Sequence, residues 1–299
     1  MVAKIARGII PALCTPFDDS GESLAAERIP PVIRALLDAG VNGFFACGGT
    51  GEGGSMTINE RKEMAELTLV EVAGAVPVIV QVGATTTDNA VELARHAVAI
   101  GAPAVASVAP VDKPNDLQAA VAHYRAIGAA ADVPFYLYWL AREAQEDLTP
   151  EEFLDAMQAV PNFAGIKFTD TNLFFFQRLI DLSAEEINAI SGPDELCLPA
   201  MVMGSDAAIG STFNVMPRIF VDMRRAFEAG DIRRAMDLQL RANRVIAVLI
   251  AHGIMWSMKT ILGWRGTPVG PPRAPHAKLD ESGVQSLRSA LESLDFEIS

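Results

Sequence analysis

The run Phe163-Ala-Gly-Ile-Lys-Phe168 is apolar except for one lysine near its end. A short, continuous apolar run of this kind predicts a β-strand that is buried on both faces. Similar units recur about every thirty residues along the chain, each an apolar run, a polar or glycine-rich loop and an amphipathic segment. This repetition is typical of successive strand–helix units in a parallel sheet.

Eight apolar runs predict eight parallel strands, which would close into a (β/α)8 TIM barrel of about 250 residues. We expect the barrel to span residues 1–225, and a C-terminal helical extension to span 226–299 and pack on it as a single structural unit. A doubly wound open sheet is the alternative, although the loops lack GxGxxG and P-loop patterns. The expected strands are Gly8–Cys14, Gly43–Cys47, Val76–Val82, Ala104–Val108, Pro134–Trp139, Ala164–Phe168, Ile187–Ser191 and Ala207–Ser211.

The composition narrows the class of function. The chain has 24 basic and 37 acidic residues and a net charge of −13, which argues against nucleic-acid binding because that needs a basic surface. The longest apolar stretch, Val245–Ala251, is too short to cross a bilayer, and the first residues show no evident signal peptide. Three scattered cysteines suit a reducing compartment. We therefore expect a cytoplasmic protein without a membrane partner.

Lys167 is the only one of the six lysines that ends an apolar run of this kind. Desolvation at such a position penalises the ammonium form, and a neutral amine can attack a ketone to form a Schiff base. Lys167 is therefore a candidate covalent catalyst. The alternative is a lysine whose stem is buried while its head extends to solvent. The position alone does not favour either interpretation.

One loop and the end of one strand near the predicted barrel mouth add candidate groups, because barrel enzymes carry their sites at the carboxyl ends of the strands. Gly48-Gly-Thr-Gly-Glu52 offers backbone N–H groups and the Thr50 hydroxyl to a carboxylate, although a tight turn would also need glycine. Tyr136 and Tyr138 share one face of the fifth strand. A tyrosine hydroxyl near Lys167 would shuttle protons during imine formation, whereas the alternative is a packed aromatic side chain.

The later loops are polar as well. Thr169 and Asp170 follow the sixth strand, and Gly192-Pro-Asp194-Glu195 follows the seventh. The two adjacent acids would either bind the hydroxyls of a polyol or cap a helix. Gly210-Ser-Thr-Phe-Asn214 follows the eighth strand and is rich in hydroxyls.

Metal chemistry is poorly supported by the sequence. A zinc-dependent aldolase would need a cluster of histidines, and the four histidines are far apart and not at strand ends. We expect no metal and no cofactor, and we expect surface positions for the histidines, which are His96, His123, His252 and His276.

Taken together, these motifs resemble the dihydrodipicolinate synthase/N-acetylneuraminate lyase family of Schiff-base, class I pyruvate aldolases. The likeness begins at Pro11-Ala-Leu-Cys-Thr-Pro-Phe17 and includes the glycine-rich signature at 48–52 with Glu60. The segments Gly165-Ile-Lys-Phe-Thr-Asp170, Gly192-Pro-Asp-Glu195 and Gly210-Ser-Thr-Phe-Asn214 resemble the N-acetylneuraminate lyase branch more closely.

The resemblance implies a role for each matching residue and a carbon–carbon lyase that releases pyruvate and an aldehyde. Lys167 would be the Schiff-base lysine and Tyr138 the proton-transfer tyrosine. Thr50 and the amides around it would hold the pyruvyl carboxylate. The family also implies a homotetramer. The residues implied to bind substrate are Gly49, Thr50, Gly51, Thr169, Gly192, Asp194, Glu195 and Ser211.

The chain departs from the family pattern at several positions. Gly49 stands where the family has a serine or threonine, Trp139 replaces an asparagine and Ala141 replaces a proline. Arg142 falls one place before the arginine with which synthases hold their second substrate, and the loop 109–114 lacks the tyrosine that synthases share between subunits. The leading hypothesis is N-acetylneuraminate cleavage. The rivals are another pyruvate-dependent aldolase, a hydratase-aldolase or synthase-like enzyme, and a non-catalytic keto-acid-binding protein.

Overall fold

The computed structural model describes residues 4–113, 116–140, 148–276 and 278–298. In these ranges eight parallel strands form one sheet in the order β1-β8-β7-β6-β5-β4-β3-β2. The two ends of the sheet meet through a parallel bridge between Ala12 and Phe45, so the sheet curls into a barrel. The strands are β1 Gly8–Pro11, β2 Phe44–Ala46, β3 Val78–Gln81, β4 Ala104–Val108, β5 Phe135–Leu140, β6 Phe163–Thr169, β7 Asn188–Ser191 and β8 Ala207–Gly210.

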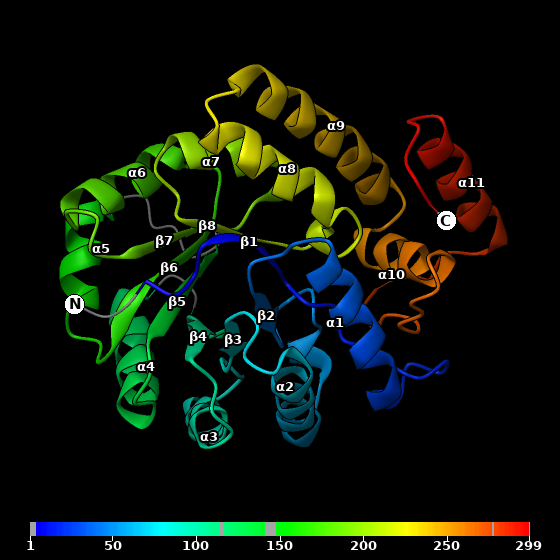
Figure 1. Ribbon diagram of the computed structural model, residues 1–299. Coiled ribbons are helices and arrows are strands. Elements are labelled where there is room, and N and C mark those ends of the chain that lie inside the picture. Colours follow the sequence, from blue (N-terminus) through cyan, green and yellow to red (C-terminus); the bar gives the residue numbers. More distant parts are fainter. Residues whose placement is uncertain (1–3, 114–115, 141–147, 277, 299) are drawn as a thin grey trace.

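Helices cover the outside of the barrel, as Figure 1 shows. A TIM barrel with C-terminal helices is therefore confirmed, and the open sheet is excluded. The barrel helices are α1 Ile29–Asp38, α2 Ile58–Val72, α3 Thr87–Ala99, α4 Leu117–Ala130, α5 Pro150–Met157, α6 Leu173–Leu182, α7 Cys197–Val202 and α8 Pro217–Glu228. Short 3-10 turns occupy η1 Ala26–Arg28, η2 Gly53–Ser55, η4 Asp194–Leu196 and η5 Thr212–Asn214.

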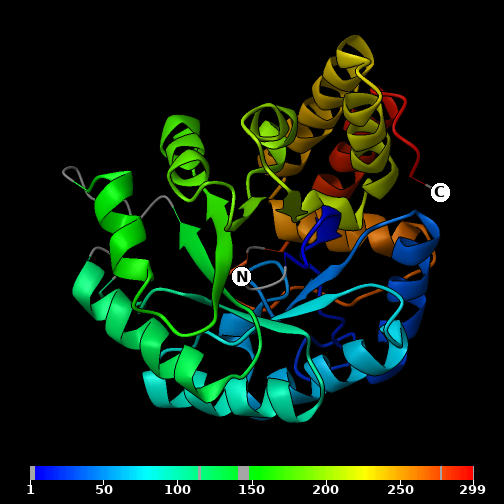
Figure 2. The same cartoon turned by 60° about the vertical axis from the view of Figure 1, so that its left-hand side comes forward.

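The C-terminal extension consists of α9 Ile232–Ala251, α10 Ile254–Trp264 and α11 Glu281–Glu292, which lie together on one side of the barrel in Figures 1 and 2. α9 packs along α8, and α10 contacts η5 after the eighth strand. Since α8 runs to Glu228, the last barrel helix ends beyond the expected boundary at residue 225.

No single helix in the described ranges is long and apolar enough to cross a membrane. α9 and α10 taken together pass in length and composition but are bent by 110°.

The strand ends differ from the expected ones for a physical reason that β1 illustrates. β1 pairs with β8 only as far as Pro11. The next residue, Ala12, still donates to the carbonyl of Gly210, and Leu13 then donates to the carbonyl of Phe45 on β2. The predicted strand Gly8–Cys14 therefore leaves the β8 ladder and turns toward β2, where it closes the barrel.

The barrel interior is filled mainly by small and branched side chains, with two tyrosines from β5. Tyr136 is fully buried, and its hydroxyl donates to Oδ1 of Asn188 at 2.8 Å. Burial raises the pKa of Tyr136 to about 12. Tyr138 packs against the same interior cluster and is less buried. Both tyrosines therefore face inward, as their spacing predicts.

Candidate active site

Lys167 lies inside the barrel next to Tyr138. The two residues are register partners in the β5–β6 ladder, so their side chains point to the same face at the same level. The Lys167 Nζ lies 3.7 Å from the centroid of the Tyr138 ring and 4.6 Å from that of Phe45. Lys167 is only 4% exposed. Its head group does not extend into bulk solvent, so the snorkelling alternative is wrong.

The glycine-rich loop after β2 contributes the Thr50 hydroxyl, which bonds to the loop after β8. The Thr50 and Ser211 hydroxyls are 2.7 Å apart and join the loops that follow β2 and β8. A Cβ on Gly51 would lie 2.9 Å from the carbonyl oxygen of Leu13, so this position needs glycine. By contrast, a Cβ on Gly49 would meet nothing within 4 Å. The loop therefore has open space where the family carries its second hydroxyl.

Asp194 is buried beside the loop after β8 rather than at a helix cap. Its Oδ1 accepts from the backbone N–H of Ser211 at 3.2 Å, and its Oδ2 accepts from the Thr212 N–H at 2.7 Å and the Thr212 hydroxyl at 2.6 Å. Neither η4 nor α7 has a side-chain cap, so Asp194 does not cap the helix that follows β7, and its carboxylate instead binds the N–H groups at the start of η5. A Cβ on Gly210 would lie 2.4 Å from Asp194 Oδ1, so glycine allows this close approach.

Burial raises the pKa of Asp194 to about 6, although the bonds from Thr212 and the charge of Lys167 oppose that rise. Lys167 itself forms no ion pair with any carboxylate of the described residues. The mouth therefore holds the Lys167 amine and a buried carboxylate whose pKa that amine lowers without forming an ion pair with it.

Thr169 and Gly192 face each other across β6 and β7. The Thr169 hydroxyl is buried and has no hydrogen-bond partner among the described residues. A Cβ on Gly192 would lie 1.8 Å from it, so glycine is required there. Glu195 is exposed, and no hydrogen bond joins its carboxylate to the groups at the mouth. The structure thus gathers the predicted residues at the mouth except for the Glu195 carboxylate.

Trp139 lies on the outer face of the barrel wall rather than in the interior. Its ring stacks with Phe168 and Phe175 at centroid distances of 6.0 and 5.4 Å, and its Nε1–H donates to Asp170 Oδ2 at 3.2 Å. The replacement of asparagine by Trp139 therefore contacts the loop after β6 from the outer side of the barrel, through Asp170. Ala141 and Arg142, the other departures after β5, and Pro114 in the loop 109–114 lie outside the described residues.

The expectation that the histidines are surface groups is wrong for His123. This residue is buried on α4, with Nδ1 2.9 Å from the Thr87 hydroxyl and Nε2 3.2 Å from the Ser107 hydroxyl. Burial lowers the pKa of His123 to about 4. In the described part of the chain no group of three or more His, Cys, Asp or Glu is placed to hold a metal ion.

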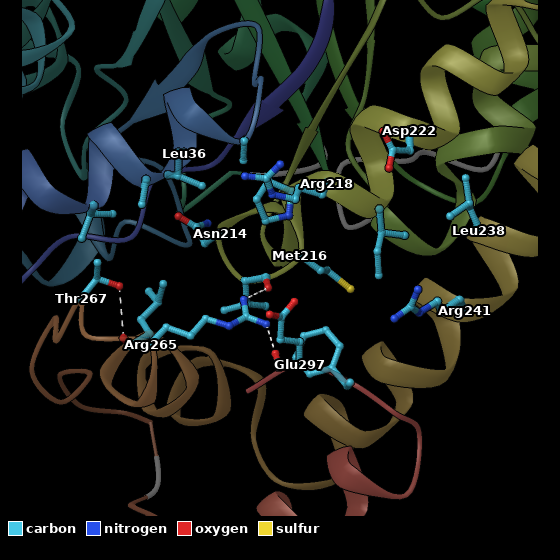
Figure 3. A pocket seen from close by; sticks show the side chains of 18 of the residues that line it. Leu36, Asn214, Met216, Arg218, Asp222, Leu238, Arg241, Arg265, Thr267 and Glu297 are labelled. Carbon is cyan, nitrogen blue, oxygen red and sulfur yellow. Dashed lines mark hydrogen bonds between the residues drawn. The ribbon is translucent and has the colours of Figure 1, made fainter. Parts of the chain in front are cut away.

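A separate cavity of about 420 Å³ lies behind the loop that follows β8, between α1, α8, α9 and the C-terminal tail (Figure 3). Arg265 crosses it and donates to the backbone carbonyls of Val215 and Glu297. None of the predicted site residues lines this cavity. It is therefore distinct from the candidate active site.

Sequence reasoning missed the two residues of the C-terminal extension that hold the glycine-rich loop, Lys259 through its side chain and Arg273 through its backbone N–H. Lys259 on α10 pairs with Glu52, and Arg273 binds both Glu52 and Glu60. The only signal in the sequence was the position of Glu60 in the family signature, which gave no indication of its partner.

The chain matches the model of the dihydrodipicolinate synthetase family over residues 5–294. It is 33% identical to the N-acetylneuraminate lyase of Rhizobium meliloti, with 95% of this chain and 94% of the relative covered. It is 31% identical to the 4-hydroxy-tetrahydrodipicolinate synthase of Methanopyrus kandleri, with 96% of each covered. The solved Proteus mirabilis N-acetylneuraminate lyase superposes with a TM-score of 0.91 at 27% identity, over 97% of this chain and 99% of that one.

These matches extend over nearly the whole chain and agree with the barrel, and they include both lyases and synthases at similar identity. The chain belongs to the dihydrodipicolinate synthetase family, whose members are lyases and aldolases that work through a Schiff base.

Proposed function

We propose that this chain cleaves a 2-keto-3-deoxy sugar acid, with N-acetylneuraminate as the leading substrate, to pyruvate and an aldehyde, here N-acetylmannosamine. The observation that carries the proposal is the buried Lys167 amine, which lies 3.7 Å from the Tyr138 ring inside the barrel. An imine-forming aldolase needs a buried amine as nucleophile and a nearby hydroxyl for proton transfer, and Lys167 and Tyr138 are side by side inside the barrel.

The reaction follows from these two groups. Lys167 Nζ attacks the C2 ketone, and loss of water leaves an iminium ion on C2. The C3–C4 bond then breaks, its electron pair forms the enamine of pyruvate, and the C4 hydroxyl loses its proton to give the aldehyde. Tyr138 relays that proton, directly or through the substrate carboxylate. Protonation of the enamine at C3 and hydrolysis of the imine release pyruvate and restore Lys167.

The remaining groups would hold the two ends of the substrate. The Thr50 hydroxyl and the amides of Gly49 and Gly51 would bind the keto-acid carboxylate, since consecutive backbone N–H groups in a tight turn suit an anion. The Thr169 hydroxyl is buried against Gly192 and has no partner in the described residues, so it would bind a substrate hydroxyl only after its side chain turns toward the mouth. Ser211, Asp194 and Gly192 complete the proposed sugar subsite, whereas Glu195 is exposed and its carboxylate forms no hydrogen bond with these groups in the described residues.

The assignment of N-acetylneuraminate as substrate is supported by the lyase relatives and by the position of Asp194 at the mouth. Pyruvate release tests it. Purified protein should release pyruvate from N-acetylneuraminate in a lactate dehydrogenase-coupled assay. A panel of other 2-keto-3-deoxy acids distinguishes the sialic-acid lyase from another pyruvate aldolase. Pyruvate with aspartate semialdehyde tests the synthase. Keto-acid binding without turnover on any of them would favour the non-catalytic alternative.

Gly49→Ser is expected to lower the KM for the keto acid. The added hydroxyl enters open space beside Thr50 and supplies one more hydrogen bond to the carboxylate, worth about 0.5–1.5 kcal/mol or about two- to tenfold in KM. Gly54→Ser is a matched control, since its Cβ also meets nothing within 4 Å and it lies in the same loop. An unchanged or higher KM in Gly49→Ser alone would place the carboxylate elsewhere.

The pH dependence of stability should reveal Asp194. Its pKa is near 4 in the unfolded chain and about 6 in the folded protein. Between these values the folded state holds a proton that the unfolded state has lost, so stability falls as the pH rises from about 4 to about 6. Thermal unfolding of wild type and Asp194→Asn across this range measures the effect. The wild type should lose about 3 kcal/mol relative to the variant, and a constant difference would contradict a raised pKa.

A homotetramer in the cytoplasm remains part of the proposal. Met236 and Leu240 on α9 and Val202 at the end of α7 are exposed apolar side chains, which would be buried by self-association.

A further inference from the structure

A buried ion pair joins the C-terminal extension to the glycine-rich loop. Lys259 Nζ on α10 lies 2.7 Å from Glu52 Oε1, and both side chains are 1% exposed. The same nitrogen donates to the carbonyl oxygen of Thr15 at 3.0 Å and lies 4.4 Å from the centroid of the Phe17 ring. Burial lowers the pKa of Lys259, while the Glu52 carboxylate opposes that shift. Removing two charges from water costs several kcal/mol per ion, so the presence of a buried pair is by itself weak evidence of a gain in stability.

Glu52 is held in an unusual backbone conformation directly after the proposed carboxylate subsite. Its φ is 55°, in the left-handed region that non-glycine residues rarely adopt. Its N–H donates to the carbonyl of Gly49, so the turn that closes on Glu52 contains Thr50. A conformation of this kind persists only when the surroundings hold it.

Both carboxylate oxygens of Glu52 are held by the C-terminal extension. Oε1 pairs with Lys259, and Oε2 accepts the backbone N–H of Arg273 at 2.7 Å. Thr15 supports the other side of the turn, because its hydroxyl donates to the carbonyl of Gly51 at 2.5 Å while its own carbonyl accepts from Lys259. Lys259 therefore contacts the two supports of the turn at once.

Arg273 is itself fixed on the barrel. Its guanidinium binds both oxygens of Glu60 at 2.6 and 3.1 Å and donates to the carbonyls of Gly21, Glu22 and Ser55. The bond from Arg273 holds the pKa of Glu60 below its usual range. Glu60 also closes the capping box of α2 with Thr57. The backbone N–H that holds Glu52 is thus anchored to the helix that begins just after the loop.

We propose that Lys259 and Arg273 are positioning residues for the keto-acid carboxylate subsite, so that the C-terminal extension is a working part of the site. The inference rests on the proposed function and deepens it. Lys259 and Arg273 do not touch substrate. They fix the left-handed turn at Glu52, and that turn sets the direction of the Thr50 hydroxyl and of the Gly49 and Gly51 amides.

The test separates positioning from stability through a neutral version of the pair. Lys259→Met and Glu52→Gln each leave one buried group unpaired and should lower the unfolding temperature. The double variant removes both charges and should recover much of that loss. If the pair positions the turn, all three variants should need at least about tenfold more pyruvate for half-maximal borohydride trapping. The maximal adduct per folded chain should stay unchanged, because Lys167 is untouched.

Lys278→Met is the matched control, since Lys278 is exposed and forms no ion pair among the described residues. It should trap pyruvate like the wild type. A double variant with wild-type half-saturation would overturn the positioning role. If the wild type itself trapped no pyruvate, the proposed function would fail, and this inference with it.

Discussion

Lys167→Ala should abolish pyruvate release from the sugar acid. We expect kcat to fall by a factor of at least about 10⁴, as it does in other enzymes that lose a covalent nucleophile. Without the amine no iminium ion forms, and the C3–C4 bond has no electron sink. The fold should survive, because Lys167 contacts aromatic rings and forms no ion pair in the described residues. Coupled pyruvate release and circular dichroism, measured together, check both statements.

Lys113→Ala is the control for that variant, since Lys113 is exposed on the loop after β4. It should keep wild-type turnover. Residual activity above a few per cent in a well-folded Lys167→Ala protein would show that another group performs the chemistry.

Tyr138→Phe should lower kcat by about 10²–10⁴ while leaving Schiff-base formation possible. The substitution removes only the hydroxyl and keeps the ring that lies 3.7 Å from the Lys167 amine. Packing and cation–ring contact therefore remain, and proton transfer is lost. The measurement is kcat for cleavage, together with the yield of borohydride-trapped pyruvate.

Tyr136→Phe is the matched control for Tyr138→Phe, because it also removes a phenolic hydroxyl from the inward face of β5. Its hydroxyl bonds Asn188, deeper in the barrel, so its loss should cost about 1 kcal/mol of stability and little kcat. Equal losses of kcat in the two variants would argue that neither hydroxyl has a special chemical role.

The strands could be predicted from the sequence because parallel strands buried on both faces are continuous apolar runs. The closeness of Tyr138 and Lys167 could be expected because each falls near a strand's carboxyl end, but their pairing in register, with a shift between Phe135 and Tyr136, could not. The exact ends of the strands could not be predicted from the sequence. β1 changes partner after Pro11, and that change depends on how the barrel closes rather than on local composition.

The parts of the site that depend on distant segments could not be predicted. Lys259 and Glu52 are far apart in the sequence, and nothing in either segment indicates a partner. Asp194 had two plausible roles in the sequence, and the structure shows that its carboxylate binds the start of η5 rather than the helix that follows β7. His123 looks like any helical histidine until its helix packs on β4, where burial and the Ser107 hydroxyl surround it.

The central claim is that the Lys167 amine forms a covalent imine with pyruvate, and reductive trapping tests it directly. Wild-type protein is treated with pyruvate and borohydride, digested, and analysed by mass spectrometry. The account predicts one reduced pyruvyl adduct, located on the peptide that contains Lys167. An unmodified Lys167, under conditions that label a known Schiff-base aldolase, would contradict it.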